Sequence, residues 1–181
     1  MQMTVNGQKK QLENWSDINW LQITKVVINL RQRIFRARQL GSFRKLRSLQ
    51  KLMLRSYANL LLSVRQITQT NTGKKTAGID KEVINTPTQR VKFVRSWKGG
   101  NFKPVRRVAI PKKNGQMRPL GIPTVRDRVM QAIVKNMLEP EWESQFEPNS
   151  YGFRPGRSCQ DAIAQSWLRL NSSPNARHTW V

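Results

Sequence analysis

A cluster of positive side chains lies in the middle of the chain, in the stretch RRVAIPKKNGQMRPLGIPT, residues 106–124. No acidic residue occurs between Glu82 and Asp127 to neutralise it. Because like charges held close together repel one another, the cluster indicates an anionic partner. Its members are Arg106, Arg107, Lys112, Lys113 and Arg118.

The Asn-Gly pair inside this stretch predicts a β-hairpin, since both positions of a two-residue hairpin turn favour residues with positive φ. The strands are expected over residues 105–110 and 116–122. Side chains alternate between the two faces of a strand, so Arg106 and Arg107 are expected to point in opposite directions. The other three positive side chains are expected near the turn.

The positive charge is large and unevenly distributed. The chain has 181 residues and a formal net charge of +23, from 33 Lys and Arg against 10 Asp and Glu. Residues 1–138 contain 29 basic and 5 acidic residues, whereas residues 139–181 contain 4 basic and 5 acidic residues. From Ile18 to Ile79 there is no acidic residue, yet the helical periodicity is clear. This pattern predicts a folded basic surface with nucleic acid as its partner.

Cysteine and histidine are too rare for a disulfide framework or a zinc site, because the chain has only Cys159 and His178. No apolar run approaches the roughly 20 residues of a membrane span. The N-terminus lacks a signal-peptide pattern. We therefore expect a cytoplasmic protein with no membrane partner.

Two helices are predicted between residues 16 and 70. Ser16 is expected to cap the first helix, which ends near Gly41, and Ser42 is expected to cap the second. The turn between them is short, so the helices should pack antiparallel. Their apolar stripes are Trp20, Ile23, Val27, Leu30, Ile34 and Ala37, then Leu46, Leu49, Met53, Tyr57, Leu60, Val64 and Ile67.

The second helix carries four positive residues at positions i, i+3, i+7 and i+11, which places them on one face away from the apolar stripe. A solvated face is the alternative interpretation. Like charges in register without acidic partners destabilise a helix, however, so the pattern favours phosphate binding. The residues are Arg44, Arg47, Lys51 and Arg55, and the first helix adds Arg31, Arg33, Arg36 and Arg38.

Turn-forming and capping residues divide the chain further downstream. The basic, turn-rich segment TNTGKKTAGIDKE, residues 70–82, is typical of a linker. A short helix is predicted over residues 87–96. Thr124 and Asp127 resemble a capping box, which opens a helix that is expected to end before Pro140.

The C-terminal part is predicted to contain one more helix and the start of a strand. Ser158 with Asp161 again predicts a helix cap, for a helix that runs to about Leu170. RHTWV, residues 177–181, is typical of the first residues of a β-strand.

The motifs in this order resemble a known family. Residues 106–163, with RPLGIPT, DR, LEP and SYGFRPGRS in succession, resemble the fingers region of the reverse transcriptases encoded by group II introns, the intron maturases. Residues 30–80 are similar to the N-terminal extension that precedes the fingers in that family. The resemblance covers residues 15–175.

The resemblance implies an α+β fold, in which a basic helical N-terminal module is followed by the fingers subdomain of a right-hand polymerase, truncated before the palm. The fingers consist of a β-hairpin plus helices. The implied domains are a loose N-terminus over residues 1–15, the helical extension over 16–70, a linker and short helix over 71–100, and the fingers with the first residues of a palm strand over 101–181.

The resemblance also implies nucleotide-binding residues. In the family, the Lys after Ile-Pro at the hairpin turn and the Arg before Pro-Leu-Gly-Ile-Pro contact the triphosphate of the incoming deoxynucleotide (dNTP), and here these are Lys112 and Arg118. A planar guanidinium and a compact ammonium group both suit a triphosphate. The alternative is a generic hairpin with surface charge. The sequence departs from the family at Lys81, where a Gly is expected, and at Gln160, where a His is expected.

The second conserved block lines the template and nucleotide site in the family, and Tyr151, Phe153, Arg154 and Arg157 match it. Arg154 is expected to bind the nucleotide, and Tyr151 and Arg157 the nucleic acid, since rings can stack on bases while arginines meet phosphates. Core packing of the two rings is the alternative. The nucleic-acid contacts expected elsewhere are Arg36, Arg44, Arg47, Lys51, Arg55, Arg106 and Arg107.

No catalytic or metal-binding residue is predicted in this chain. A polymerase holds two Mg²⁺ ions with carboxylates, and the resemblance places these on palm strands, in an Asp and a later Asp-Asp pair. The chain would end just before that site, so Mg²⁺ is expected in the complete family enzyme only. The aspartates present, none adjacent to another, are Asp17, Asp80, Asp127 and Asp161, and Glu139, Glu141, Glu143 and Glu147 are expected to be surface acids.

We therefore expect a fragment of a group II intron RNA-directed DNA polymerase and maturase, without polymerase activity alone. The expected partners are group II intron RNA, an RNA template with a DNA primer, dNTP, and a second polypeptide that carries the palm. A decayed gene, one half of a split enzyme and a deliberately expressed piece remain open as origins, with decay favoured. The rival function is a stand-alone basic RNA-binding module.

Overall fold

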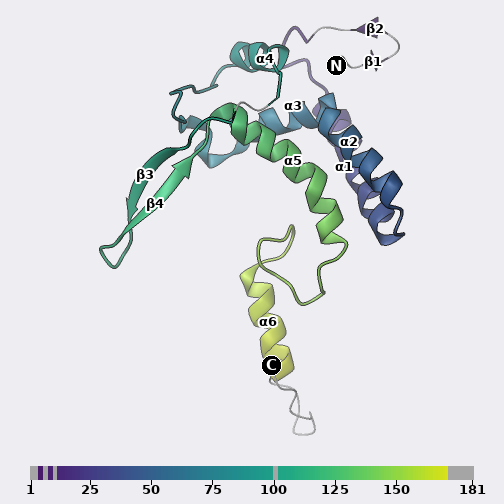
Figure 1. Ribbon diagram of the computed structural model, residues 1–181, viewed down its shortest axis with the longest axis vertical. Helices are drawn as coiled ribbons and strands as arrows, with labels where there is room; N and C mark the ends of the chain where they lie inside the picture. The colour runs from purple at the N-terminus through teal and green to yellow at the C-terminus, as the bar shows by residue number, and fades with distance from the viewer. Residues whose placement is uncertain (1–3, 6–7, 10–11, 100–101, 171–181) are drawn as a thin grey trace.

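The computed structural model describes residues 4–5, 8–9, 12–99 and 102–170, and the strand predicted at residues 177–181 lies outside them. A short antiparallel pair, β1 (Thr4–Val5) and β2 (Gln8–Lys9), precedes a body of helices. From this body a β-hairpin projects at one end, and a last helix lies beyond the other (Figure 1). The α+β class is confirmed.

The helical body has one hydrophobic core. Helix α1 (Trp20–Gln39) packs against α2 (Phe43–Arg55), α3 (Tyr57–Arg65) and α5 (Val125–Glu143). The apolar stripe predicted for the first helix is confirmed, because its residues from Ile23 to Ala37 are buried there. The core thus joins residues of the N-terminal module to a helix that follows the hairpin. Figure 1 shows α5 lying beside the N-terminal helices.

The first helix begins later than predicted. Asn19, not Ser16, is its N-cap, and the Asn19 side chain accepts a hydrogen bond from the Gln22 backbone N–H at 3.1 Å. Trp15, predicted in the loose N-terminus, is buried in the core and donates from Nε1 to Gln69 Oε1 at 3.2 Å. The chain is therefore tied down before α1 starts.

The second predicted helix is interrupted at Ser56. This residue is extended, with φ −67° and ψ 120°, and its hydroxyl caps α3 by accepting from the Asn59 backbone N–H. The Asn59 amide donates to the carbonyls of Met53 and Ile133, at 3.1 and 3.3 Å. Periodicity did not reveal the break because the apolar residues stay in phase across it. Helix α3 then continues into a π-helical turn (Gln66–Thr70) and a 3₁₀ turn (Thr72–Lys75).

The turn-rich segment 70–82 is held against the start of α5. Arg128 donates to the carbonyls of Gly73 and Thr76, at 3.1 and 2.5 Å. A Cβ on Gly78 would lie 2.7 Å from the Thr124 Cα, so only glycine permits this approach. Helix α4 (Pro87–Arg95) follows and confirms the short helix predicted there.

The predicted hairpin is confirmed to within one residue at each strand, β3 (Arg106–Pro111) and β4 (Met117–Ile122). Its turn differs from the prediction, since only Gly115 has positive φ, at 78°. The Lys112 N–H donates to the Gln116 carbonyl and the Gly115 N–H to the Lys112 carbonyl. This is the three-residue loop in which glycine follows a turn and forms a bulge.

The last two helices both begin where predicted. Thr124 caps α5, but this helix continues through Pro140 to Glu143, so the predicted end before Pro140 is wrong. Pro140 is buried, and its packing outweighs the one backbone hydrogen bond that proline cannot donate. Ser158 and Asp161 hydrogen-bond each other at the start of α6 (Cys159–Leu170), of which no residue is buried.

Candidate nucleic-acid interface

The predicted basic face of α2 is present and open to solvent. Its four residues are exposed and have no hydrogen-bond or ion-pair partner for their side chains among the described residues. The helix buries Leu46, Leu49 and Met53 on the opposite side. From the first to the last of the four, the helix axis advances by about 17 Å. The face consists of Arg44, Arg47, Lys51 and Arg55, which we call the α2 basic face.

The arginines of α1 fall into two groups. Arg31 donates to Glu139 Oε2 at 2.5 Å, and Arg38 donates to Gln145 and lies over the Phe43 ring, so both attach α1 to neighbouring segments. Arg33 and Arg36 are exposed and unpaired within the described residues. Of the α1 arginines, these two are therefore the ones open to solvent without a partner in the described chain.

The hairpin presents its positive residues on two faces. Residues paired across the strands share a face, so Arg118, opposite Ile110, lies on the same face as Arg106. Lys112 directly follows β3, where its N–H donates to the Gln116 carbonyl, and Arg107 lies on the other face. All four are exposed. Arg106 and Lys112 are separated by about 20 Å along the hairpin, so a single small anion at the tip cannot contact both.

Little of the positive charge is compensated internally. Among the described residues, the ion pairs join Arg31 and Lys135 to Glu139, and Arg154 to Glu143. Burial alone would raise the pKa of the Glu139 carboxyl, but the hydrogen bond and charge of Arg31, with Lys135, outweigh it and hold that pKa below its ordinary value. Glu139 and Glu143 therefore serve as internal partners, and the α2 basic face is left to solvent.

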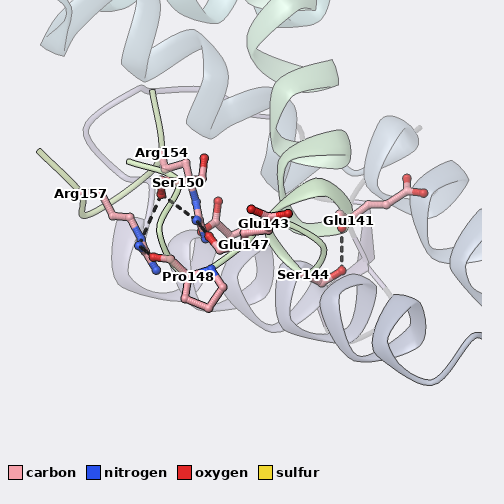
Figure 2. A network of polar contacts seen from close by, with 8 residues as sticks. All are labelled: Glu141, Glu143, Ser144, Glu147, Pro148, Ser150, Arg154 and Arg157. Atoms are coloured by element: carbon pink, nitrogen blue, oxygen red, sulfur yellow. Dashed lines mark hydrogen bonds and ion pairs between the residues drawn. The ribbon is translucent and has the colours of Figure 1, made fainter. Parts of the chain in front are cut away.

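Arg154 and Arg157, the arginines of the second conserved block, hydrogen-bond to backbone carbonyls of their own loop, as Figure 2 shows. Arg154 is buried; its Nε and Nη2 donate to Glu143 Oε1 at 3.0 and 2.6 Å, and its Nη1 donates to the carbonyls of Glu147 and Ser150 at 2.8 Å. Arg157 donates to the carbonyls of Pro148 and Ser150. We call residues 147–157 the stapled loop.

The two rings of the stapled loop differ in environment. Tyr151 is half-buried beneath the Arg157 guanidinium, 5.3 Å from the ring centroid. Phe153 is wholly exposed and has φ of 58°, so core packing of this ring is wrong for the described chain. The loop and the hairpin are attached at opposite ends of α5, whose 19 residues span about 28 Å. The nucleotide role of Arg154 and the nucleic-acid roles of Tyr151 and Arg157 stay predictions.

The acidic residues do not form a metal site. Within the described ranges, no group of three or more His, Cys, Asp or Glu could hold an ion. Asp127 is buried against the Thr124 cap, and Asp161 caps α6, which lowers the pKa of its carboxyl through hydrogen bonds from Ser158. These residues do not fit the two-metal arrangement of a polymerase. In the same part of the chain, no helix combines the length and hydropathy that crossing a membrane requires.

Several positioning residues were not found from the sequence. The Asn59 clamp between α3 and α5 has no local signal, because an asparagine in an apolar stripe is recognised only when its partners are known. Arg128 likewise has no local signal, because the carbonyls that it binds, those of Gly73 and Thr76, are distant in the sequence. Lys81 did give one: it departs from the glycine expected there, and it has φ of 57°.

Comparison with known proteins agrees with this architecture. Residues 15–97 match the N-terminal domain of reverse transcriptase, and residues 110–181 match the reverse transcriptase (RNA-dependent DNA polymerase) family. The chain belongs to the reverse transcriptase family.

Its relatives include proteins of group II introns. The chain is 44% identical over 98 residues to the group II intron-encoded protein LtrA of Lactococcus lactis subsp. cremoris, which covers 51% of this chain and 16% of that protein. Protein YkfC of Escherichia coli (strain K12) is 49% identical over 84 residues, 45% of this chain and 22% of YkfC. Maturase-like protein 1 of Euglena gracilis is 28% identical over 162 residues, 84% of this chain and 35% of the relative. The chain thus corresponds to the N-terminal part of group II intron reverse transcriptases and maturases. It spans between 16% and 35% of the length of these three relatives.

Proposed function

We propose that the chain binds group II intron RNA through the α2 basic face, extended by Arg33 and Arg36. The observation that carries the proposal is the α2 basic face itself: four exposed positive side chains in register, with no acidic partner among the described residues. Phosphate groups would neutralise a row of charge that otherwise destabilises its own helix. The α2 basic face would contact the RNA backbone, so it would contribute affinity rather than sequence specificity.

The tip of the hairpin, in this proposal, grips the triphosphate of a dNTP. Lys112 directly follows β3 and Arg118 is the second residue of β4, so both lie at the turn end of the hairpin, and both are exposed. A stand-alone RNA-binding module would not need such a pair. The template, the primer and the polypeptide that supplies the palm belong to the same proposal, since the chain spans 16% to 22% of the length of LtrA and YkfC.

The double variant Arg47→Glu plus Lys51→Glu tests the RNA surface. We expect weaker binding to a group II intron RNA and a shallower dependence of log K on log salt, because each lost phosphate contact removes roughly 0.7 to 0.9 from the slope. The measurement is a filter-binding titration at several salt concentrations.

The matched control is Arg47→Lys plus Lys51→Arg, which keeps both charges and should keep the slope. Circular dichroism checks that the helices of both variants are intact. If the charge-reversed protein has the wild-type slope, the α2 basic face does not contact RNA.

A further inference from the structure

The β-hairpin extends from the helical body, yet burial of its strands does not set its direction. No residue of β3 or β4 is buried, and the principal contacts of each strand are with the other. A two-stranded hairpin is at best marginally stable when nothing packs against it. The groups that hold it must therefore lie at its base, where the chain enters β3 and leaves β4.

A single buried carboxylate connects the two sides of this base. Asp127, in the first turn of α5, is only 4% exposed. Its Oδ2 accepts a hydrogen bond from the Thr124 hydroxyl at 2.7 Å and another from the Lys103 backbone N–H at 3.4 Å. Lys103 lies just before β3, and Thr124 lies just after β4. Asp127 therefore ties the incoming chain to the outgoing chain, in addition to capping α5 with Thr124.

The preceding residue, Arg126, attaches the same base to α4. Its guanidinium lies over the Phe93 and Trp97 rings, 5.1 and 5.5 Å from their centroids. A cation in this position is attracted by the negative face of each ring. The Arg126 Nη1 also donates to the Gly99 carbonyl at 3.4 Å. Arg126 thus holds the end of α4, and the residue that leads toward the hairpin, against the start of α5.

Two glycines let the chain pack closely around this base. A Cβ on Gly78 would lie 2.9 Å from the Pro123 carbonyl oxygen, and a Cβ on Gly121 would lie 2.9 Å from the Val105 Cγ2. A side chain at either position would force its neighbour to move. The base of the hairpin is therefore packed on the side of each strand, and it does not form an open hinge.

We propose that Arg126 and Asp127 are positioning residues, a clasp that fixes the direction of the hairpin relative to the helical body. The proposal rests on the proposed function, in which the hairpin tip holds a triphosphate while the α2 basic face holds RNA. A rotation of about 10° at the base would move the tip of a strand about 20 Å long by about 3.5 Å. A reacting group does not tolerate a misplacement of this size, so the tip requires a fixed base.

The test measures the position of the hairpin directly, by double electron–electron resonance between nitroxide labels on the full chain. The labels are attached at Lys113→Cys in the hairpin turn and at Gln32→Cys on α1, both exposed positions, after Cys159→Ser removes the exposed native thiol. We expect one narrow distance distribution in this background. Asp127→Ala and Arg126→Ala should each broaden it at least twofold.

A second label pair and two matched variants separate positioning from general stability. Labels at Gln32→Cys and Gln131→Cys report on α1 and α5 alone, and their distance distribution should be unchanged in both clasp variants. Asp161→Ala removes the carboxylate of the capping box at α6. Arg38→Ala removes a guanidinium that lies 5.0 Å from the Phe43 ring centroid, at the turn between α1 and α2. Both should leave the hairpin distribution as narrow as in the background.

Three results would overturn the proposal. They are a broad hairpin distribution in the background, a hairpin distribution that stays narrow in either clasp variant, and broadening of the distance between α1 and α5 as well, which would assign the clasp to general stability. These measurements use neither RNA nor nucleotide. A failure of the proposed function would be seen separately, as wild-type dNTP affinity in Lys112→Ala or as a wild-type salt slope in the Arg47 and Lys51 variant.

Discussion

At the scale of single residues, the positive charge of the chain has two uses. Arg31 and Arg154 form ion pairs with Glu139 and Glu143, and Arg128 holds backbone carbonyls, so these side chains maintain the fold. Desolvation by burial lowers the pKa of Arg128, partly countered by the charge of Asp80. Among the described residues, those of the α2 basic face and the hairpin are exposed and unpaired, and in the proposed function they are the ones that meet an anion. A count of charges cannot make this distinction.

Lys81 is a residue whose type conflicts with its backbone. It has φ of 57° and an exposed side chain, and it stands where the family resemblance implies glycine. The neighbouring Gly78 lies against Thr124, so the segment cannot shift to relieve the conformation. The strain at Lys81 is therefore imposed by the packing of the segment on α5.

We predict that Lys81→Gly stabilises the chain by about 1 kcal/mol, because glycine adopts positive φ without the steric cost. Urea denaturation followed by circular dichroism measures the difference. Lys81→Ala removes the same charge but keeps Cβ, so it should give no such gain. Equal stabilisation by both variants would show that charge repulsion, not backbone strain, is relieved.

At the scale of elements, α5 is the part to which the others attach. Asn59 donates to the Ile133 carbonyl and accepts from Asn136 at 2.8 Å, which links the break before α3 to the middle of α5. One turn further, Arg31 links α1 to Glu139. These polar contacts, together with the shared core, make the basic helices and the fingers helix one packed unit. The predicted boundary between an extension and the fingers thus runs through a continuous core.

The Arg31–Glu139 contact predicts a pH dependence. The pKa of Glu139 is lower in the folded chain than its ordinary value of 4.5, so its contribution is present above that pH and is lost as the pH falls through the folded pKa. We expect Glu139→Gln to be less stable than wild type by about 1.5 kcal/mol at neutral pH. The deficit should shrink as the pH falls below 4.5.

Denaturation midpoints of both proteins across this pH range provide the measurement. Glu82→Gln, at an exposed position, is the matched control and should be neutral. A deficit in Glu139→Gln that persists unchanged at low pH would mean that side-chain packing, not the charge of Glu139, is the source of its stability.

At the scale of the whole molecule, the core lies in the helical body while the hairpin and α6 extend away from it (Figure 1). No residue of β3, β4 or α6 is buried. Both extended parts carry groups that suit a partner: positive charge on the hairpin and apolar side chains on α6. The described part of the chain therefore leaves two extended surfaces of different chemistry open to solvent.

We predict that the chain alone extends no primer on any template in the presence of Mg²⁺. The full sequence has four aspartates, none adjacent. Asp127 and Asp161 serve in helix caps, and Glu139 forms an ion pair. A polymerase needs carboxylates that converge on two metal ions. A primer-extension gel provides the test, with a complete reverse transcriptase of the same family as the positive control. Clear extension by the purified chain would contradict this assignment.

Local sequence features determined much of this structure. The hairpin, the apolar stripe of α1, the short helix α4 and the caps at Thr124 and Ser158 depend on neighbouring residues, so their positions could be predicted. The α2 basic face follows from helical spacing alone. The family itself was readable because its motifs are contiguous in the chain, and the matches over residues 15–97 and 110–181 agree with it.

Only the tertiary structure decided the features that depend on residues distant in the sequence. The break at Ser56 is stabilised by the hydrogen bond from Asn59 to the Ile133 carbonyl of α5. Helix α5 continues through Pro140 because the packing of this buried residue outweighs one lost hydrogen bond. The sequence predicted binding roles for Arg154 and Arg157 as it did for the exposed arginines. In the fold, however, both side chains donate to carbonyls of their own loop. Charge and periodicity are properties of the sequence, but whether a side chain is used internally or left for a partner depends on which groups the fold brings within hydrogen-bonding distance.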